Sequence, residues 1–406
     1  MSEERLHLIH DPADSVSDAP VDSPVDSPID SIVHLASRLV ATPSCAGIDP
    51  PQPVLSLVQS WLAENGLAPR LLDDPSGKPA AVLVEIAGAA PGPVLCLDAC
   101  IDTAPAGDPG QWSAPPFSGV VQDGRLLGRG AADSKAGVAI LAHVARHFSE
   151  RGLPRGALHV LFDADEHTGR FGGVRAYLDA VGRPPDAASL GYPGNDCIVV
   201  GSRGFLRARL RFAGVAAHSG DAERRGVNAL TKAAAFALKL AEPVFPDTPD
   251  AAFPFGPAAT VTRIEGGEGF SVVPDLAVCH IDIRLTRTFD AAEATRWLED
   301  IVRAVDAAAG IEIVDSWPAY VVPRDDRLAQ SFTQAAGAAF GRPFAADVCG
   351  HSNIGNLLAA RGVPTVCAPG VSFGNMHAAD EWADIESIGP VYAMYCEAAR
   401  SFLSRP

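Results

Sequence analysis

The stretch Leu127-Gly-Arg-Gly-Ala-Ala-Asp133-Ser-Lys-Ala-Gly137 decides the fold, because it joins a glycine-rich turn and an acidic residue to the start of an apolar helix. That helix is predicted over residues 135–148. Short apolar runs typical of buried strands precede and follow it, at 94–99 and 158–163. Strand, helix and strand at this spacing form a βαβ unit, which predicts a mainly parallel sheet.

Further along the chain, the apolar pattern changes from continuous runs to alternation. Residues 205–212 and 276–284 alternate apolar and polar side chains, as half-exposed antiparallel strands do. The α/β pattern returns after Trp317. We therefore predict an α/β domain with a mainly parallel mixed sheet, interrupted by an inserted α+β domain of the ferredoxin-like kind. The predicted boundaries are 31–202 and 316–406 for the α/β domain, and 203–315 for the inserted domain.

Residues 1–30 are predicted to form a flexible leader. Most of the near-repeat Pro20-Val-Asp-Ser-Pro-Val-Asp-Ser-Pro-Ile-Asp-Ser31 lies in this leader, and it is too polar to fold alone. The chain carries 32 Lys and Arg against 49 Asp and Glu, a net charge of −17 that opposes binding to nucleic acid. No apolar run is long enough to span a membrane, and no secretory signal precedes the helices. Its 8 cysteines include no CxxC pair, so we expect reduced thiols and a cytoplasmic location without membrane partners.

Polar side chains gather where the predicted parallel strands end, which is where open α/β sheets bind ligands. Taken singly, each has an ordinary explanation: Asp133 would cap the following helix, and a lone histidine is usually a surface or core residue. Their clustering at the ends of several strands favours a functional site instead. These residues are Cys100, Asp102, Asp133, Asp165, Glu166, His167, Tyr192 and His377.

The whole pattern resembles the metallopeptidase family of acetylornithine deacetylase, succinyl-diaminopimelate desuccinylase, aminoacylase and carboxypeptidase G. The strongest likeness is residues 127–137, which are similar to the family's GRGxxDxKGG. Further similar segments are Asp102–Asp108 with Trp112, Ala217-His218-Ser219, Gly226-Val-Asn228-Ala, Gly266–Pro274 and Asp282-Ile-Arg284. The resemblance implies a zinc-dependent amide hydrolase, in which the interrupted domain is catalytic and the inserted one is a lid and dimerisation domain.

The resemblance also implies a metal centre, and this chain departs from it at three positions. The family binds two zinc ions bridged by one aspartate, here Asp133. Among the ligands of the first zinc ion, Cys100 replaces a histidine and Tyr192 replaces a carboxylate. A phenol with a pKa near 10 is a poor zinc ligand. Among the ligands of the second zinc ion, His167 replaces a glutamate, so that this ligand set becomes Asp133, His167 and His377. We expect one zinc ion per chain, bound by this second ligand set, or two zinc ions if Cys100 binds as a thiolate.

The same two-histidine, one-carboxylate set also suits non-haem iron. Hydrolysis is favoured because Glu166 occupies the position of the family's general base. The resemblance also implies that His218 stabilises the oxyanion in the site of a partner subunit. It implies that Arg284 binds a substrate carboxylate; alternatively, Arg284 forms a surface ion pair. Asp102 orients the family's first histidine, so its role beside Cys100 stays open. Other substrate-side candidates are Asn228, His351 and Asn353.

The predicted function is metal-dependent hydrolysis of an amide bond in an N-acyl amino acid, a dipeptide or a related small molecule, by a homodimer with Glu166 as general base. Two alternatives remain open. The first is a non-catalytic or metal-poor relative kept for binding, because three ligand positions differ. The second is an acyl-transfer enzyme that uses Cys100 as nucleophile and a nearby histidine as base.

Overall fold

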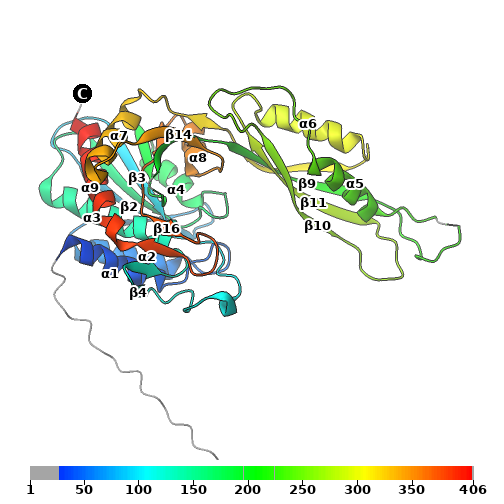
Figure 1. Ribbon diagram of the computed structural model, residues 1–406, viewed down its shortest axis with the longest axis horizontal. Coiled ribbons are helices and arrows are strands. Elements are labelled where there is room, and N and C mark those ends of the chain that lie inside the picture. Colours follow the sequence, from blue (N-terminus) through cyan, green and yellow to red (C-terminus); the bar gives the residue numbers. More distant parts are fainter. Residues whose placement is uncertain (1–26, 195, 224, 405–406) are drawn as a thin grey trace, which may run out of the picture.

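The structure is a computed structural model that describes residues 27–194, 196–223 and 225–404. A large α/β body and a smaller antiparallel body lie side by side along the long axis of the molecule (Figure 1). The larger body contains a central sheet with the strand order β1-β2-β6-β3-β7-β15-β8-β13, and β14 pairs with β8. This arrangement confirms the predicted α/β class with an inserted second unit.

Parallel pairing dominates the middle of the central sheet, as predicted. β3 pairs in parallel with β6 and β7, and β15 pairs in parallel with β7. The β3–α3–β6 segment is the βαβ unit expected around residues 127–137. The strands of this sheet are β1 (Arg70–Asp73), β2 (Pro79–Ala87), β3 (Val94–Cys100), β6 (Ala157–Asp163), β7 (Ala187–Leu190), β8 (Cys197–Ser202), β13 (Tyr320–Val321), β14 (Ala345–Cys349) and β15 (Thr365–Cys367).

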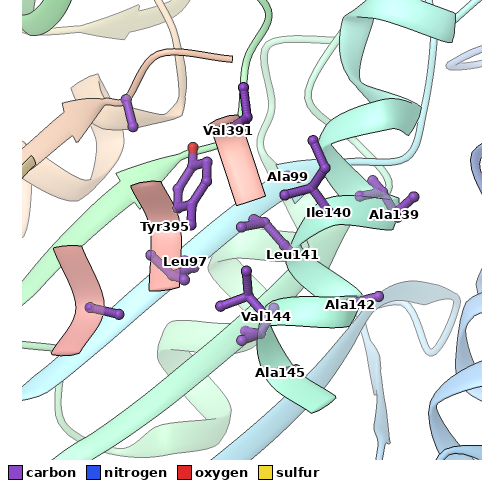
Figure 2. Packing of buried hydrophobic residues seen from close by; sticks show 14 of the residues in the cluster. Leu97, Ala99, Ala139, Ile140, Leu141, Ala142, Val144, Ala145, Val391 and Tyr395 are labelled. Atoms are coloured by element: carbon purple, nitrogen blue, oxygen red, sulfur yellow. The ribbon is translucent and has the colours of Figure 1, made fainter. Parts of the chain in front are cut away.

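Helices cover both faces of the central sheet. One face packs against α1 (Pro28–Val40), α2 (Gln52–Glu64), α3 (Ala136–Arg151), α7 (Arg327–Phe340) and α9 (Ile388–Ser404). The other packs against α4 (Gly172–Val181) and α8 (Ile354–Ala360). Figure 2 shows Leu141 of α3 and Tyr395 of α9 beside Leu97 and Ala99 of β3, all within one buried cluster. This burial fixes α3, and therefore the turn that precedes it, against the sheet.

The smaller body is a four-stranded antiparallel sheet with helices on one face. Its chain order is βαββαβ and its strand order is β10-β11-β9-β12, which is the ferredoxin-like arrangement. Its elements are β9 (Gly204–Ala213), α5 (Ala229–Ala241), β10 (Ala258–Gly266), β11 (Leu276–Leu285), α6 (Ala291–Arg303) and β12 (Gly310–Trp317). Sequence periodicity did not single out β10, because most of its side chains are exposed or half-buried.

Two short connections join the bodies. Only Arg203 separates β8 from β9, and Pro318 and Ala319 separate β12 from β13. The connections touch each other, since a Cβ added at Gly204 would lie 2.3 Å from the carbonyl oxygen of Trp317. β12 extends two residues past the predicted boundary at 315, and both domain boundaries stay predictions.

A third, small sheet ties the glycine-rich turn to the C-terminal part of the chain. Trp382 pairs with Leu127 across β17 and β5. Its strands are β4 (Val121–Gln122), β5 (Arg125–Leu127), β16 (Phe373–Gly374) and β17 (Trp382–Asp384). Short helical turns occur at Pro109–Gln111, Ala131–Lys135 and Ile385–Ser387. This sheet brings the regions of residues 127–133 and 374–381 together.

The first helix begins earlier than the sequence pattern indicated. The leader was predicted to extend to residue 30, but α1 starts at Pro28, because the Ser27 hydroxyl oxygen accepts a hydrogen bond from the Asp30 amide. Serine at this position and proline in the first turn are a common helix start. Residues 1–26 of the predicted leader lie outside the described residues. Within the described part of the chain, no helix has the length and apolar character needed to cross a membrane.

Buried His143 on α3 makes the stability of the fold depend on pH. Its ring lies 4.5 Å from that of Trp61, and its nitrogens bond to the Ala139 carbonyl and the Ser31 hydroxyl. Burial lowers the pKa of His143 to about 4, below its value in an unfolded chain. The unfolded chain therefore binds one more proton at mildly acidic pH, so stability falls as pH falls through this window.

Because of His143, we expect the free energy of unfolding to fall by about 1 kcal/mol for each unit by which the pH is lowered between about pH 6 and 4. His143→Gln, which cannot take up the proton, should flatten the decrease, as measured by denaturant midpoints at several pH values. His34→Gln, at an exposed position of α1, serves as the control. Equal pH slopes in wild type and His143→Gln would contradict the assignment.

Candidate metal centre

Separate chain segments converge at the carboxyl ends of β3, β6 and β7. Cys100 ends β3, and its register partner Asp163 ends β6. The turn after β6, the residues after β7, the turn before α3 and the loop between β16 and β17 supply the other groups. The sequence-predicted residues at this edge are Cys100, Asp102, Asp133, Glu166, His167, Tyr192 and His377.

Two histidines face one oxygen of Asp133. His377 Nε2 lies 3.0 Å from Asp133 Oδ2, and His167 Nε2 lies 3.5 Å from the same oxygen. The ligand atoms of this trio all lie within 4.8 Å of one another. His167 Nε2 is buried and has no hydrogen-bond partner among the described residues. A buried, unpaired imidazole nitrogen that faces a carboxylate and a second imidazole fits a transition-metal ion such as zinc.

Asp133 does not cap α3, so the alternative explanation for this residue was wrong. The capping position of α3 belongs to Lys135, and no side chain bonds to its first amides. Asp133 instead lies in the turn just before the helix. Although burial opposes it, the facing imidazoles of His167 and His377 lower the pKa of Asp133, which favours its ionised carboxylate.

Asp102 orients His167 rather than Cys100. One of its oxygens, Oδ2, lies 2.8 Å from the His167 amide nitrogen and 3.2 Å from His167 Nδ1. The other oxygen accepts a hydrogen bond from the Glu166 amide at 3.1 Å. Because Nδ1 faces Asp102, Nε2 is directed toward Asp133. A carboxylate that holds the outer nitrogen of a ligand histidine in this way fixes its tautomer and orientation.

Cys100 and Asp133, which occupy ligand positions of the family's first zinc ion, lie within hydrogen-bonding distance of Ser134. The Ser134 hydroxyl donates to Asp133 Oδ1 at 2.7 Å, and Cys100 Sγ lies 3.5 Å from Ser134 Oγ and 4.0 Å from Asp133 Oδ1. Burial, together with the charges of Asp133 and Glu166, raises the pKa of the Cys100 thiol. The thiol form is therefore favoured there. Sequence analysis missed Ser134, whose proximity to Asp133 was its only signal.

Glu166 is paired with Tyr192. The Tyr192 hydroxyl donates to Glu166 Oε1 at 2.9 Å, and Glu166 Oε2 lies 3.4 Å from His167 Nδ1. Burial, aided by the charges of Asp133 and Asp102, raises the pKa of Glu166 to about 7. A carboxyl group with this pKa exchanges protons near neutral pH, as a general base requires.

A second possible ligand trio overlaps the first. One ligand atom each of Cys100, Glu166 and His167 also lies within 4.8 Å of the others. His167 belongs to both trios, and use of the second would engage Glu166 as a ligand. The Asp133 trio leaves Glu166 free to act on a proton.

The loop that carries His377 is held in an unusual conformation. Asn375, His377 and Asp380 all have positive φ angles, of 55°, 64° and 57°, which side chains other than glycine rarely adopt. Asp380 accepts hydrogen bonds from the Ser113 amide at 2.7 Å and hydroxyl at 2.8 Å. Arg129 donates to the Ala378 carbonyl at 3.1 Å. These contacts, absent from our sequence-based candidates, hold half-exposed His377 against Asp133.

Two more carboxyl groups lie buried behind the site. Asp98, on the same side of β3 as Cys100, has no hydrogen-bond partner for either oxygen within the described residues, and one oxygen of Asp163 is also unpaired. Burial and nearby carboxylates raise the pKa of both. The protonated, neutral form of each is therefore favoured relative to an exposed aspartate, which limits the negative charge beside the candidate metal centre.

The structure places the remaining candidates away from this cluster or in other contacts. His218 is exposed and bridges to Val272. Its segment, between β9 and α5, lies at the end of the smaller body distant from the central sheet (Figure 1). Asn228 caps α5, and buried Asn353 caps α8, so both stabilise helix starts. His351 lies within electrostatic reach of Asp133 and His377.

Arg284 forms the ion pair that we considered as its alternative role. Its Nε lies 2.6 Å from Asp282 Oδ1, and its Nη1 donates to the Ser352 hydroxyl at 3.2 Å. Ser352 directly follows His351, so the Arg284 side chain reaches the edge of the candidate centre. The ion pair occupies part of the guanidinium and leaves other donors for a ligand.

Comparisons with known proteins agree with this architecture. A family model described as Peptidase family M20/M25/M40 matches residues 96–401. A succinyl-diaminopimelate desuccinylase of Rhodospirillum centenum is 31% identical over 319 residues, which cover 75% of this chain and 80% of that protein. The structure of an M20 family metallo-carboxypeptidase of Sulfolobus solfataricus superposes with a TM-score of 0.76 at 16% identity, covering 91% of this chain and 99% of that one. A dinuclear metal-binding peptidase of Bacillus subtilis superposes with a TM-score of 0.67 at 19% identity, covering 93% and 99%.

A mainly parallel sheet with potential metal ligands at its strand ends, joined to an inserted antiparallel body, is the architecture of two-domain metallo-hydrolases. The chain belongs to the peptidase family M20/M25/M40, since the matched span covers well over half of it. The resemblance inferred from residues 127–137 is therefore confirmed.

The contact between Asp102 and His167 yields a testable expectation. Asp102→Asn replaces one acceptor oxygen by an NH₂ group that cannot accept hydrogen bonds from His167. Zinc affinity, measured by competition with a chelator, should fall by about 10- to 100-fold. Asp108→Asn, in the same loop but away from the histidines, is the matched control. Wild-type affinity in Asp102→Asn would show that His167 is oriented by other contacts.

Proposed function

We propose that this protein hydrolyses an amide bond in an N-acyl amino acid, a dipeptide or a related small molecule, with one zinc ion bound by Asp133, His167 and His377. The proposal is based on the observation that the two oxygens of the Asp133 carboxylate have different partners. Oδ2 faces the two imidazoles, whereas Oδ1 accepts the Ser134 hydroxyl. A proton donor therefore occupies the oxygen that would otherwise bridge to a second ion.

Asp133, His167 and His377 would hold the zinc ion, which would supply Lewis acidity. Glu166 would take a proton from the attacking water and pass it to the leaving amine. Its pKa of about 7 suits both steps near neutral pH. The Tyr192 hydroxyl holds one Glu166 oxygen by a hydrogen bond, which leaves the other to exchange the proton. Asp102 keeps His167 oriented through Nδ1.

The proposed assembly is a homodimer, in which His218 serves the site of the partner subunit. His218 is exposed and remote from its own centre, and exposed apolar side chains accompany it on the lid. The large exposed apolar residues there include Val215, Val227, Leu238, Val244, Phe270 and Val272. Exposed apolar surface of this kind favours association with another copy. Arg284 is proposed to bind a substrate carboxylate, in a protein that acts in the cytoplasm on small molecules.

The alternative in which Cys100 acts as nucleophile receives no support from its surroundings. A nucleophilic cysteine needs an accessible thiolate. Cys100 is buried, and burial raises the pKa of its thiol. A Cys100→Ser variant is therefore not expected to abolish turnover.

Metal content tests the proposed centre directly. Mass spectrometry of the purified protein under native conditions should find about one zinc ion per chain, because the trio offers a single set of three ligands. His167→Ala and His377→Ala should each lose the ion, whereas Tyr192→Phe should keep it. His280→Ala, a histidine on the lid sheet, is the control. Two tightly held ions would refute the mononuclear centre, and none under zinc-replete conditions would favour a metal-poor binding protein.

The role of Glu166 is tested by an isosteric variant. Glu166→Gln should lower kcat by a factor of about 10² to 10⁴ on a panel of N-acyl amino acids and dipeptides, because the amide cannot accept a proton. Zinc content should be unchanged, since Glu166 is not a proposed ligand. Glu150→Gln, on the surface of α3, is the control. Wild-type turnover in Glu166→Gln would remove Glu166 from the mechanism.

A further inference from the structure

The loop between β6 and α4, residues 164–171, carries both Glu166 and His167. We call it the His167 loop. Its amides at these two residues donate to the carboxylate of Asp102, at 3.1 and 2.8 Å. The α/β body thus holds the amide groups of this backbone. The two carbonyl groups that follow His167 accept hydrogen bonds from another part of the molecule.

Two side chains from the four-stranded sheet of the smaller body donate to these carbonyls. Arg207 Nη1 lies 3.1 Å from the carbonyl oxygen of Thr168, and Trp317 Nε1 lies 3.4 Å from that of Gly169. Arg207 belongs to β9, and Trp317 ends β12, which pairs with β9. The backbone directly after His167 is therefore bonded to the inserted body.

The alternation of side chains along β9 explains why Arg207 faces the His167 loop. The side chains of Ala208, Leu210 and Phe212 are buried against α5 and α6. Residues between them therefore point to the opposite face of the sheet. Phe205 lies on that opposite face and is buried among residues of the α/β body. This end of the face thus packs against the α/β body, which brings the Arg207 guanidinium to the loop.

The loop is shaped to receive both donors. Gly169 has a φ of 76°, and a Cβ added there would lie 2.6 Å from Arg207 Nη1. A side chain at this position would displace the guanidinium. The Trp317 ring lies 6.0 Å from the ring of Phe171, and the Arg175 guanidinium lies 5.1 Å from it. These contacts orient the indole so that its N–H meets the loop.

The two donors differ in strength. A hydrogen bond from a charged guanidinium is stronger than one from a neutral indole, and the Arg207 bond is also the shorter. Arg207 Nε lies 3.5 Å from Asp282, so this ion pair uses a different nitrogen from the one that meets Thr168. The Arg207 side chain is 39% exposed, so shortening it leaves no buried cavity. Arg207 therefore provides the larger part of the restraint.

We propose that Arg207 and Trp317 are positioning residues for the catalytic centre, because they hold the His167 loop from the inserted body. Asp102 holds the amides of the loop and these two residues hold its carbonyls, which limits both rotation and displacement of the backbone. Catalytic and metal-binding groups must be held within about 0.5 Å of their productive geometry. The kinetic part of this inference rests on the proposed function, whereas the restraint itself exists without zinc or substrate.

The test uses variants that remove the donors but keep most of the packing. Arg207→Met retains the aliphatic stem, and Trp317→Phe retains an aromatic ring. In the metal-free protein, hydrogen exchange measured by mass spectrometry should become about fivefold faster in the segment 164–171 of Arg207→Met. Arg209→Met is the matched control, since this arginine of the same strand bonds to Glu312 within the smaller body.

Metal binding and kinetics separate positioning from general stability. Zinc affinity, measured by competition with a chelator, should fall by about tenfold in Arg207→Met, the lower end of the range for residues that orient ligands. The loss should be smaller in Trp317→Phe. The value of kcat should fall while KM stays near the wild-type value, because the loop acts on bound substrate. A purely structural role would lower the denaturant midpoint and leave zinc affinity unchanged.

Wild-type exchange of the segment 164–171 in both variants would overturn the inference, as would wild-type zinc affinity in both. The two proposals fail separately. If the wild type binds zinc but hydrolyses none of the N-acyl amino acids and dipeptides, the proposed function fails, and faster exchange with weaker zinc binding still supports the positioning role. If the wild type hydrolyses them and both variants equal it in exchange, zinc affinity and kcat, the positioning role fails and the proposed function stands.

Discussion

The buried ion pair between Arg129 and Glu381 is the contact on which the candidate site depends. The two residues are far apart in the chain, and both side chains are almost fully buried. Glu381 Oε1 also accepts hydrogen bonds from the amides of Ala132 and Asp133, at 3.0 and 3.2 Å. One carboxylate thus holds both the turn that presents Asp133 and the loop that presents His377. Loss of one partner would leave an uncompensated charge in the interior, which is strongly destabilising.

Much of the fold could be predicted from periodicity. Continuous apolar runs identified β3 and β6, and alternation identified β9 and β11, because burial on two faces or on one determines which residues a strand tolerates. The edge strand β10 was missed, since its side chains are mostly exposed. Positions after strands indicated a cluster of polar candidates, and the family resemblance singled out Asp133, His167 and His377 among them as possible metal ligands. Their hydrogen-bond partners could not be predicted, because Ser113 and Asp380 meet only through tertiary folding.

The changes at Cys100, His167 and Tyr192 form a consistent set. Asp102 bonds to His167 Nδ1, Ser134 bonds to one oxygen of Asp133, and the Tyr192 hydroxyl bonds to Glu166. These hydrogen bonds lower the energetic cost of burying the groups that form them, whereas His167 Nε2 has no hydrogen-bond partner among the described residues. From the sequence alone these positions were only departures from a ligand pattern. In the structure, these positions take part in a network of hydrogen bonds.

The junction between the two bodies has a mechanical consequence. Two adjacent and nearly continuous strand connections, in contact at Gly204 and Trp317, act as a double-stranded strap. Arg203 anchors it to the carbonyls of Gly350 and Gly256. Any displacement of the smaller body must therefore bend both connections together and disturb the Arg203 contacts.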